Sequence, residues 1–502
     1  MKTFKMVHRY RKSLGKFALW FVFLILVVFF VYIRLSEFGN LTDSVGSDDT
    51  LSYLNASEIS FPSLAFFTSS RTATLPFVYK IFRPQDDYQL RHISRPVISG
   101  SEMRPEKIPG FERVIIFQIG VAIFCWVSLA LALFRHLVHP VTKILSVVLV
   151  LLFGLSPQMA DWDQILLSES LSFSLFALMI ALVIELAFSL CNKKPAWVPY
   201  IWVSMLSIVM VIWVFLRDTN SYLTLFSIFF VALLILLAFR RKVIDPAPLV
   251  VLLVVEIALF GFHQATFRAS DRWKLPLLNN MIYNVFPYPN RVSFFEARGM
   301  PVTPELLKIN IYANETNIYD DEPFMAWVQQ RGLGSYTEFL IRSPVWALLS
   351  VYHDIDILFS ENLQPYFKVN PADNLFDEIP LKTAKRPWWL LIIGNSLHAV
   401  SPAVLWMSAF LTLMMLAVAF RQRSTSAIIW AILACWFFLG GLILLSTGYL
   451  GEVRSIIRHA MAGVVPLRLS LWLFFAILAD LILTGSPNDQ RTNYSPGQDA
   501  VG

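Results

Sequence analysis

Long apolar segments recur along this chain, and they constrain its fold more than any other feature. A bilayer core about 30 Å thick needs roughly 20 apolar residues in a helix. Ten segments of about this length occur, so the sequence predicts an all-α polytopic membrane protein with about ten transmembrane helices. The expected spans are 17–34, 113–134, 141–157, 165–190, 197–216, 220–239, 246–263, 402–420, 427–446 and 462–484. A shorter apolar segment, 388–400, contains polar residues and is expected to lie in the membrane interface.

The composition agrees with a membrane protein and excludes other classes. Of 502 residues, 56% are hydrophobic and 15% are charged, which excludes a disordered chain and a nucleic-acid-binding one. The three cysteines form no C-x-x-C pair and lie beside no histidine cluster, so neither a disulfide framework nor a structural zinc site is implied.

The distribution of Lys and Arg predicts the orientation. Six Lys or Arg residues lie within 1–16, and no A-x-A cleavage site follows, so the first span is expected to be a retained anchor with a cytoplasmic N-terminus. Ten spans then place the C-terminus in the cytoplasm as well, in a membrane expected to be the bacterial inner membrane. The basic residues that this threading puts on the cytoplasmic side are Arg135, Lys143, Lys193, Lys194, Arg240, Arg241, Lys242, Arg421 and Arg423.

The spacing of the spans divides the chain. A transmembrane module, 1–263, includes a long outer loop at 35–112. Residues 264–387 are long enough for a small extracytoplasmic domain, either helical or of mixed α+β type, and 388–484 hold the C-terminal transmembrane helices. The polar segment 485–502 is expected to be a disordered cytoplasmic tail.

The informative polar residues gather near the expected outer face, where ionisable groups at span ends usually have a function. The adjacent carboxylates of Asp48 and Asp49 begin the first cluster, which continues with Tyr53 and Arg71. Such carboxylates serve as a general base or as partners of a metal or a cation. Local spacing alone favours the simpler alternative, a helix cap near Leu51.

A second cluster precedes and enters the fourth span. Asp161, Asp163 and Glu169 lie within nine residues, without Lys or Arg among them, a density that suits a hard divalent cation or a polar substrate. Alternatively, Asp163 caps the helix and Asp161 is solvated. Glu169 falls just inside the apolar segment and should face the bundle interior. A third cluster contains Arg217, which an ordinary interfacial turn also explains.

A fourth cluster lies before the last span. Arg454 and Arg458 are four residues apart, so they share a helix face, and His459 follows directly. Two guanidinium groups and an imidazole suit a phosphate at the membrane boundary. Contact with outer lipid headgroups explains the same residues equally well.

Taken together, these motifs resemble the GT-C superfamily of integral-membrane glycosyltransferases. The resemblance covers residues 1 to about 264 and the final outer loop. GT-C enzymes include protein mannosyltransferases, the aminoarabinose transferase of lipid A, and oligosaccharyltransferases. The motifs are the acidic pair Asp48-Asp49 with Tyr53 and Ala56, the Arg71–Pro76 stretch, Leu167-Ser-Glu-Ser170, Leu216-Arg-Asp218 and Arg458-His459.

The resemblance implies sugar transfer from a polyprenyl-phosphate donor to an acceptor hydroxyl on the outer face, usually with inversion. The acceptor would be a glycan, a lipid or a protein. By matching position, Asp48 or Asp49 would be the general base. The resemblance implies that the donor phosphate is bound by Arg217, Arg454, Arg458 and His459. It implies that the acceptor or the sugar is bound by Glu169, Asp163, Tyr53 and Arg71. Some members also bind a divalent cation such as Mg²⁺ or Mn²⁺, and here its ligands would be Asp161, Asp163 and Asp49.

The chain lacks the Asp-Glu pair of the mannosyltransferases and the large soluble domain of the oligosaccharyltransferases, so the sugar and the acceptor stay open. The alternative function is a transporter or flippase of lipid-linked saccharides. A transporter should carry ionisable groups near mid-bilayer on several spans. Here such groups collect at one face, with Glu185 and Glu256 as the main exceptions, which favours the enzyme.

Overall fold

The computed structural model of the chain describes residues 2–39, 41, 48–83, 110–191, 195–241, 245–309, 318–360, 386–453 and 456–485. Within these residues the fold is helical and contains no β-sheet, as the sequence predicts. Nine of the helices are long and apolar enough to cross a membrane. They are α1 (Lys2–Phe38), α5 (Glu112–His136), α8 (Glu169–Cys191), α9 (Trp197–Val214), α10 (Asn220–Arg241), α11 (Ala247–Ala269), α20 (Ala403–Gln422), α21 (Thr425–Gly451) and α22 (Ile456–Thr484).

A tenth span is present in broken form, at the third predicted position. It consists of α6 (Pro140–Leu155), α7 (Pro157–Ala160) and η1 (Asp161–Gln164), with a bend of 53° between the two halves. Proline lacks the amide hydrogen that continues a helix, and it disfavours helical geometry at the residue before it. Ser156, which precedes Pro157, accordingly has an extended backbone with ψ of 147°. Counting this pair, each predicted span corresponds to a helix or to a broken helix in a multi-pass membrane protein.

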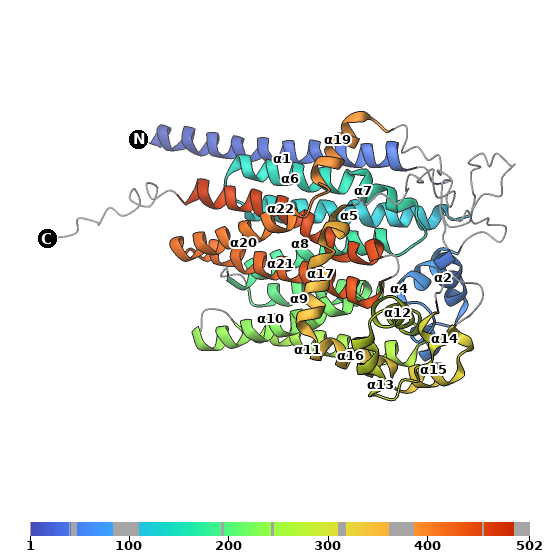
Figure 1. Cartoon of the computed structure of the whole chain (residues 1–502). Helices are drawn as coiled ribbons and strands as arrows, with labels where there is room; N and C mark the ends of the chain where they lie inside the picture. The colour runs from blue at the N-terminus through green and yellow to red at the C-terminus, as the bar shows by residue number, and fades with distance from the viewer. Residues whose placement is uncertain are drawn as a thin grey trace.

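The membrane-length helices lie side by side, and α8 and α22 form the centre of the bundle (Figure 1). In each of these two helices 89% of the most apolar 18-residue window is buried, against 17% in α1. A helix that is apolar on all sides is expected at the centre. The start of α1 and the end of α22 lie at one end of the bundle, and α2 (Asp48–Glu58), α3 (Leu64–Phe67) and α4 (Thr74–Phe82) belong to the opposite end, where Figure 1 labels α2 and α4.

A second hydrophobic cluster lies at that opposite end, built from residues 273–339. It buries aromatic side chains such as Phe295, Phe324 and Trp327 away from the main core. It is helical, in agreement with one of the two forms expected for the outer domain. Its elements are α12 (Lys274–Asn280), η2 (Met281–Val285), α13 (Pro289–Glu296), α14 (Pro304–Leu307), η3 (Ile318–Asp320), α15 (Glu322–Trp327), η4 (Val328–Gly332) and α16 (Leu333–Arg342).

Three further short helices pack directly on the bundle. The helix α17 (Pro344–His353) contributes Val351 to the main core, and α18 (Ile355–Ser360) contributes Leu358 and Phe359. The Arg468 guanidinium of α22 donates a hydrogen bond of 3.1 Å to the Phe359 carbonyl. The third helix, α19 (Trp388–Leu397), has ten residues, too few to span a bilayer, and it packs on α6, α7 and α22.

Candidate functional site

The first outer loop supplies one wall of the candidate site, and hydrogen bonds fix its position. The helix α2 packs on α4, and both are attached to the segment that leads into α8. The hydroxyl groups of Thr50 and Tyr79 both donate to the Leu166 carbonyl, at 3.0 and 2.8 Å. Because Thr50 directly follows Asp49, these bonds hold Asp49 beside the N-terminus of α8.

Asp49 lies between two arginines that come from distant parts of the chain. Its Oδ1 accepts from Arg71 and its Oδ2 accepts from Arg458 Nη1 at 2.7 Å. The Arg71 guanidinium also lies over the Tyr53 ring, 4.9 Å from its centre. Burial of Asp49 raises the pKa of its carboxyl, but the charges of Arg71 and Arg458 outweigh burial and lower the pKa to about 2.

Glu169 extends this chain of charges into the bundle. It is the first residue of α8, and it is fully buried. Its Oε1 accepts from Arg458 Nε at 2.7 Å and lies 3.8 Å from Arg217 Nη1. The helix N-terminus also favours a negative charge here. Arg458 therefore bridges two carboxylates, that of Asp49, which is partly exposed, and that of Glu169, which is buried in the interior.

The predicted cationic cluster is assembled in part. Arg217, Arg458 and His459 lie around one cavity, and Arg217 Nη2 donates to the Arg458 carbonyl at 3.4 Å. His459 Nε2 lies 3.1 Å from Glu452, which also accepts from the Asn279 amide at 2.8 Å. Arg454 lies outside the described residues, as does the side chain of Asp48.

The cavity between these groups has a volume of about 470 Å³ and two unlike walls. Asp49, Arg71, Arg217, Arg458 and His459 form a charged wall. The rest of the lining includes an apolar wall, which comes mainly from α11, α12 and α16. Its apolar residues include Phe267, Trp273, Leu277, Leu333, Leu340 and Ile341.

The outer helical cluster is attached to the bundle beside this cavity. The Tyr336 hydroxyl donates to the Leu450 carbonyl at 2.9 Å, and the Asn280 amide donates to the Gly451 carbonyl at 2.8 Å. Both carbonyls belong to the last turn of α21, where the helix leaves them without intrahelical partners. These bonds fix α12 and α16, which carry most of the apolar wall, to the end of α21.

One charged residue of the cavity, Arg272, was not anticipated from the sequence. Asp218 lies 3.3 Å from Arg272 Nε and 3.2 Å from His263 Nε2. Arg272 also donates to three carbonyls of the first outer loop, those of Phe67, Ser69 and Arg71. Arg272 therefore holds the loop that carries Arg71. The signal was present in the sequence, since Arg272 is an ionisable residue at the outer end of a span.

The expected metal set of Asp161, Asp163 and Asp49 is not assembled, and this expectation is corrected. The Asp161 carboxylate pairs with Arg386 at 2.5 Å, and Asp163 pairs with Arg34 at 2.7 Å. Both pairs are buried, and neither aspartate lines the cavity. Among the described residues no three His, Cys, Asp or Glu side chains could together hold a metal ion. The two carboxylates instead attach the broken span to α1 and to the segment before α19.

These pairs also change the interpretation of Asp163 as a sugar or acceptor ligand. Its Oδ2 is occupied by Arg34, and its Oδ1 accepts from the Ser170 hydroxyl at 2.7 Å. Its side chain is about 1% exposed, so a substrate in the cavity does not reach it. Tyr53 and Arg71, which have the same expected role, do line the cavity, whereas Glu169 lies behind Arg458.

Comparison with known proteins gives a match only in three-dimensional structure. No protein-family model matches the chain, and no curated protein matches its sequence. Among solved structures, one match is the archaeal oligosaccharyltransferase AglB from Archaeoglobus fulgidus in complex with an inhibitory peptide and a dolichol-phosphate, with 13% identity, a TM-score of 0.41, and coverage of 91% of this chain and 50% of that one.

Two other structures of the Archaeoglobus fulgidus oligosaccharyltransferase match similarly. The apo form has 12% identity and a TM-score of 0.42, and it covers 90% of this chain and 50% of its own. The complex with Zn and sulfate has 12% identity and a TM-score of 0.40, and the match covers 92% of this chain and 51% of that one. This chain thus spans about half the length of the proteins that it matches. At such low identity and TM-score these matches assign this chain neither a family nor an activity.

Proposed function

We propose that this protein is a membrane glycosyltransferase that moves a sugar from a polyprenyl-phosphate donor to an acceptor hydroxyl, with inversion at the anomeric carbon. The observation that carries the proposal is the Asp49 carboxylate, held between Arg71 and Arg458 in a cavity with one charged and one apolar wall. A carboxylate and several cations within one site are what proton abstraction and departure of a phosphate require.

The two walls of the cavity match the two parts of a lipid-phosphate donor. The phosphate fits beside Arg458, Arg217 and His459, because guanidinium groups bind phosphate oxygens at two points. The lipid chain fits against the apolar wall. Ile341 of that wall is 73% exposed on the protein, so the chain has a path from the cavity into surrounding lipid.

In the proposed reaction Asp49 takes the proton from the acceptor hydroxyl as the acceptor oxygen attacks the anomeric carbon. A new bond forms between this carbon and the acceptor oxygen. The bond from the anomeric carbon to the phosphate oxygen breaks, and its electron pair stays on the phosphate. The charge that develops there is stabilised by Arg458 and Arg217, which are positioned before the reaction begins.

The pair between Asp49 and Arg458 adds an order to these events. While Arg458 contacts Asp49 at 2.7 Å, the carboxylate is a weak base with a pKa of about 2. A donor phosphate competes for the same guanidinium. When Arg458 turns to the phosphate, Asp49 loses one of its two cations, so its basicity rises. Donor binding thus activates the base before the acceptor reacts.

The proposed setting follows from the arrangement of the spans. The cavity lies at the end of the bundle opposite the start of α1, so a cytoplasmic N-terminus places the reaction on the outer face (Figure 1). Within a bacterial inner membrane, this site would serve the synthesis of cell-envelope glycans or glycolipids. The acceptor would be a glycan, a lipid or a protein that reaches the cavity from outside.

The proposal is tested with the full chain reconstituted in lipid vesicles and a panel of polyprenyl-phosphate sugars. The expected result is release of free polyprenyl phosphate together with transfer of the labelled sugar, both lost in Asp49→Asn. Movement of intact lipid-linked saccharide across the vesicle, without cleavage, would instead support the transporter. A preparation that binds the donor but cleaves none of the panel, with every acceptor class present, contradicts the enzyme.

A further inference from the structure

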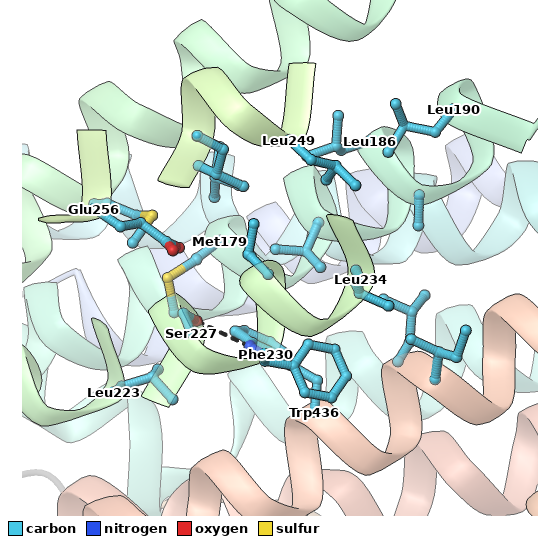
Figure 2. Close-up of a pocket in the computed structure, with 18 of the residues that line it drawn as sticks. Met179, Leu186, Leu190, Leu223, Ser227, Phe230, Leu234, Leu249, Glu256 and Trp436 are labelled. Carbon is cyan, nitrogen blue, oxygen red and sulfur yellow. Dashed lines mark hydrogen bonds between the residues drawn. The ribbon is translucent and has the colours of Figure 1, made fainter. Parts of the chain in front are cut away.

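A second cavity, of about 140 Å³, lies inside the bundle between α8, α9, α10, α11 and α21 (Figure 2). Leucine, valine, isoleucine and aromatic side chains form most of its lining, and Leu186, Leu234, Leu249 and Trp436 are examples. Its volume is roughly tenfold what one water molecule needs. The apolar lining and the position among membrane-length helices indicate a hydrocarbon ligand rather than water.

The cavity is long and narrow in the direction of the helices. On α8 its lining extends from Met179 to Cys191, which is about 18 Å at the helical rise per residue. At the end where α8 terminates, the lining residues Leu190, Leu234 and Leu433 are only half-buried. A single lipid chain that enters from the bilayer at this end fits such a shape.

Two polar groups in this lining lack hydrogen-bond partners in the described part of the chain. Glu256 is 2% exposed and its Oε2 is unpartnered, and Thr224 is 1% exposed with an unpartnered Oγ1. Figure 2 shows the Glu256 carboxyl at the cavity. Ser227 provides a contrast, because its hydroxyl accepts from Trp436 Nε1 at 2.9 Å. Buried polar groups are normally paired, so the two exceptions point to a ligand with a polar atom.

We propose that this cavity binds the chain of a lipid that carries a hydroxyl group, with the hydroxyl beside Glu256 and Thr224. A hydroxyl both donates and accepts, so it pairs with a carboxyl group in either protonation state and with threonine. A plain hydrocarbon chain would fill the cavity but leave both groups unpartnered. An anionic headgroup would have no counter-charge, since Glu256 and Cys191 are the ionisable residues of the lining and neither carries a positive charge.

This site is separate from the charged cavity, and it does not depend on the proposed reaction. The two cavities share no lining residue, and two neighbouring residues of α10 line different ones, Tyr222 the charged cavity and Leu223 the apolar one. None of the residues Glu256, Thr224 and Leu249 contributes to the charged cavity. A variant at these positions can therefore change lipid binding alone.

The test uses the full chain in lipid nanodiscs and two photoreactive probes, a long-chain primary alcohol with an alkyl diazirine and the same chain without its hydroxyl. The alcohol should label peptides of α10, α11 and α21 about fivefold more strongly than the alkane, which is the effect expected of one net hydrogen bond. Glu256→Leu should remove this preference, whereas Glu256→Gln, which still pairs with a hydroxyl, should keep most of it.

Matched variants control for folding and for access. Leu249→Trp fills the cavity and should abolish labelling by both probes. Val254→Trp is the control, because Val254 lies on the same helix and is 61% exposed. If Glu256→Leu does not fold, Thr224→Val gives the same comparison. Equal labelling by the two probes, or labelling that persists in Leu249→Trp, would overturn the proposal.

Discussion

Asp49 and Arg458 lie 409 positions apart in the sequence, and their side chains form an ion pair of 2.7 Å. The pair connects α2, in the first outer loop, to the start of α22 at the centre of the bundle. Arg458 also reaches Glu169 at 2.7 Å, so one guanidinium links the outer cavity to the interior of the bundle. Most of the predictions below concern this pair.

Replacing Asp49 by Asn should lower sugar transfer by more than about a hundredfold, the range typical for loss of a general base. Asn keeps the size of the side chain but does not take the proton. Asp48→Asn, a matched change at the neighbouring residue, should have little effect, because Asp49 is the residue that pairs with Arg71 and Arg458. Turnover measured in vesicles, with size-exclusion profiles as a folding control, checks both. Full activity of Asp49→Asn would exclude it as the base.

At Arg458, a change of shape should matter as well as a change of charge. Arg458→Lys keeps the charge but loses the planar contact to two partners, so both turnover and donor affinity should fall. Arg458→Gln should cost more. If the arginine stabilises the leaving phosphate, kcat falls along with kcat/KM, whereas a docking contact would change chiefly KM. A fall in thermal stability with unchanged kinetics would assign Arg458 a structural role only.

The pH profile should differ between free and donor-bound enzyme. The Asp49 carboxyl in the resting site has a pKa of about 2, so it is ionised at all higher pH, and kcat/KM should show no acid limb from this group near neutrality. With the donor phosphate bound, Arg458 leaves Asp49 and a negative charge approaches, so both changes raise the pKa. The acid limb of kcat should therefore lie at higher pH than that of kcat/KM. If the acid limbs of kcat and kcat/KM fall at the same pH, Arg458 does not move from Asp49 to the donor phosphate.

How far the sequence predicted this structure depends on the range of the interactions. The spans followed from the lengths of the apolar segments, which are local properties. The break before Pro157 was not anticipated, although proline marks it, because Pro157 falls at the end of the segment 141–157, which was expected to be one span. Tertiary contacts with Thr50 and Gln118 satisfy the backbone beyond the break.

Several residues that line the charged cavity were singled out from the sequence, but their pairing was not. Local spacing favoured a helix cap for the Asp48-Asp49 pair. In the structure Asp49 instead pairs with Arg71 and Arg458, which are 22 and 409 positions away in the sequence. Similarly, the three carboxylates of 161–169 suggested a cation site because no Lys or Arg is near them in sequence. Their partners, Arg386, Arg34 and Arg458, come from other segments. No pattern within a short window contains that information.

The orientation can be tested by cysteine labelling in a background in which Cys125, Cys191 and Cys435 are replaced by Ser. Ser293→Cys, at an exposed position in the outer cluster, should react with a membrane-impermeant maleimide in intact cells. Arg423→Cys, in the exposed turn between α20 and α21, should react only after permeabilisation. The reverse pattern would invert the topology and place the charged cavity on the cytoplasmic face.

The pair of Arg34 and Asp163 should contribute to stability rather than to chemistry. Both side chains are about 1% exposed, and Arg34 Nη2 lies 2.7 Å from Asp163 Oδ2. Arg34 also donates to the Gly154 carbonyl, just before the break at Pro157. Arg34→Met leaves a buried carboxylate without its partner, which typically costs about 3–5 kcal/mol. The thermal transition, measured in detergent at one scan rate, should therefore fall by several degrees.

The double variant Arg34→Met with Asp163→Leu separates pairing from packing. Replacing both charges by apolar residues of similar size is often neutral, so the double variant should regain most of the lost stability. Arg342→Gln provides the exposed control. Arg342 pairs with Glu338, and the two side chains are 66% and 39% exposed. Such exposed pairs contribute at most about 1 kcal/mol to the free energy of unfolding. If Arg34→Met is no worse than Arg342→Gln, the buried pair does not hold α1 against the broken span. If the double variant is as unstable as the sum of its singles, the two residues act independently.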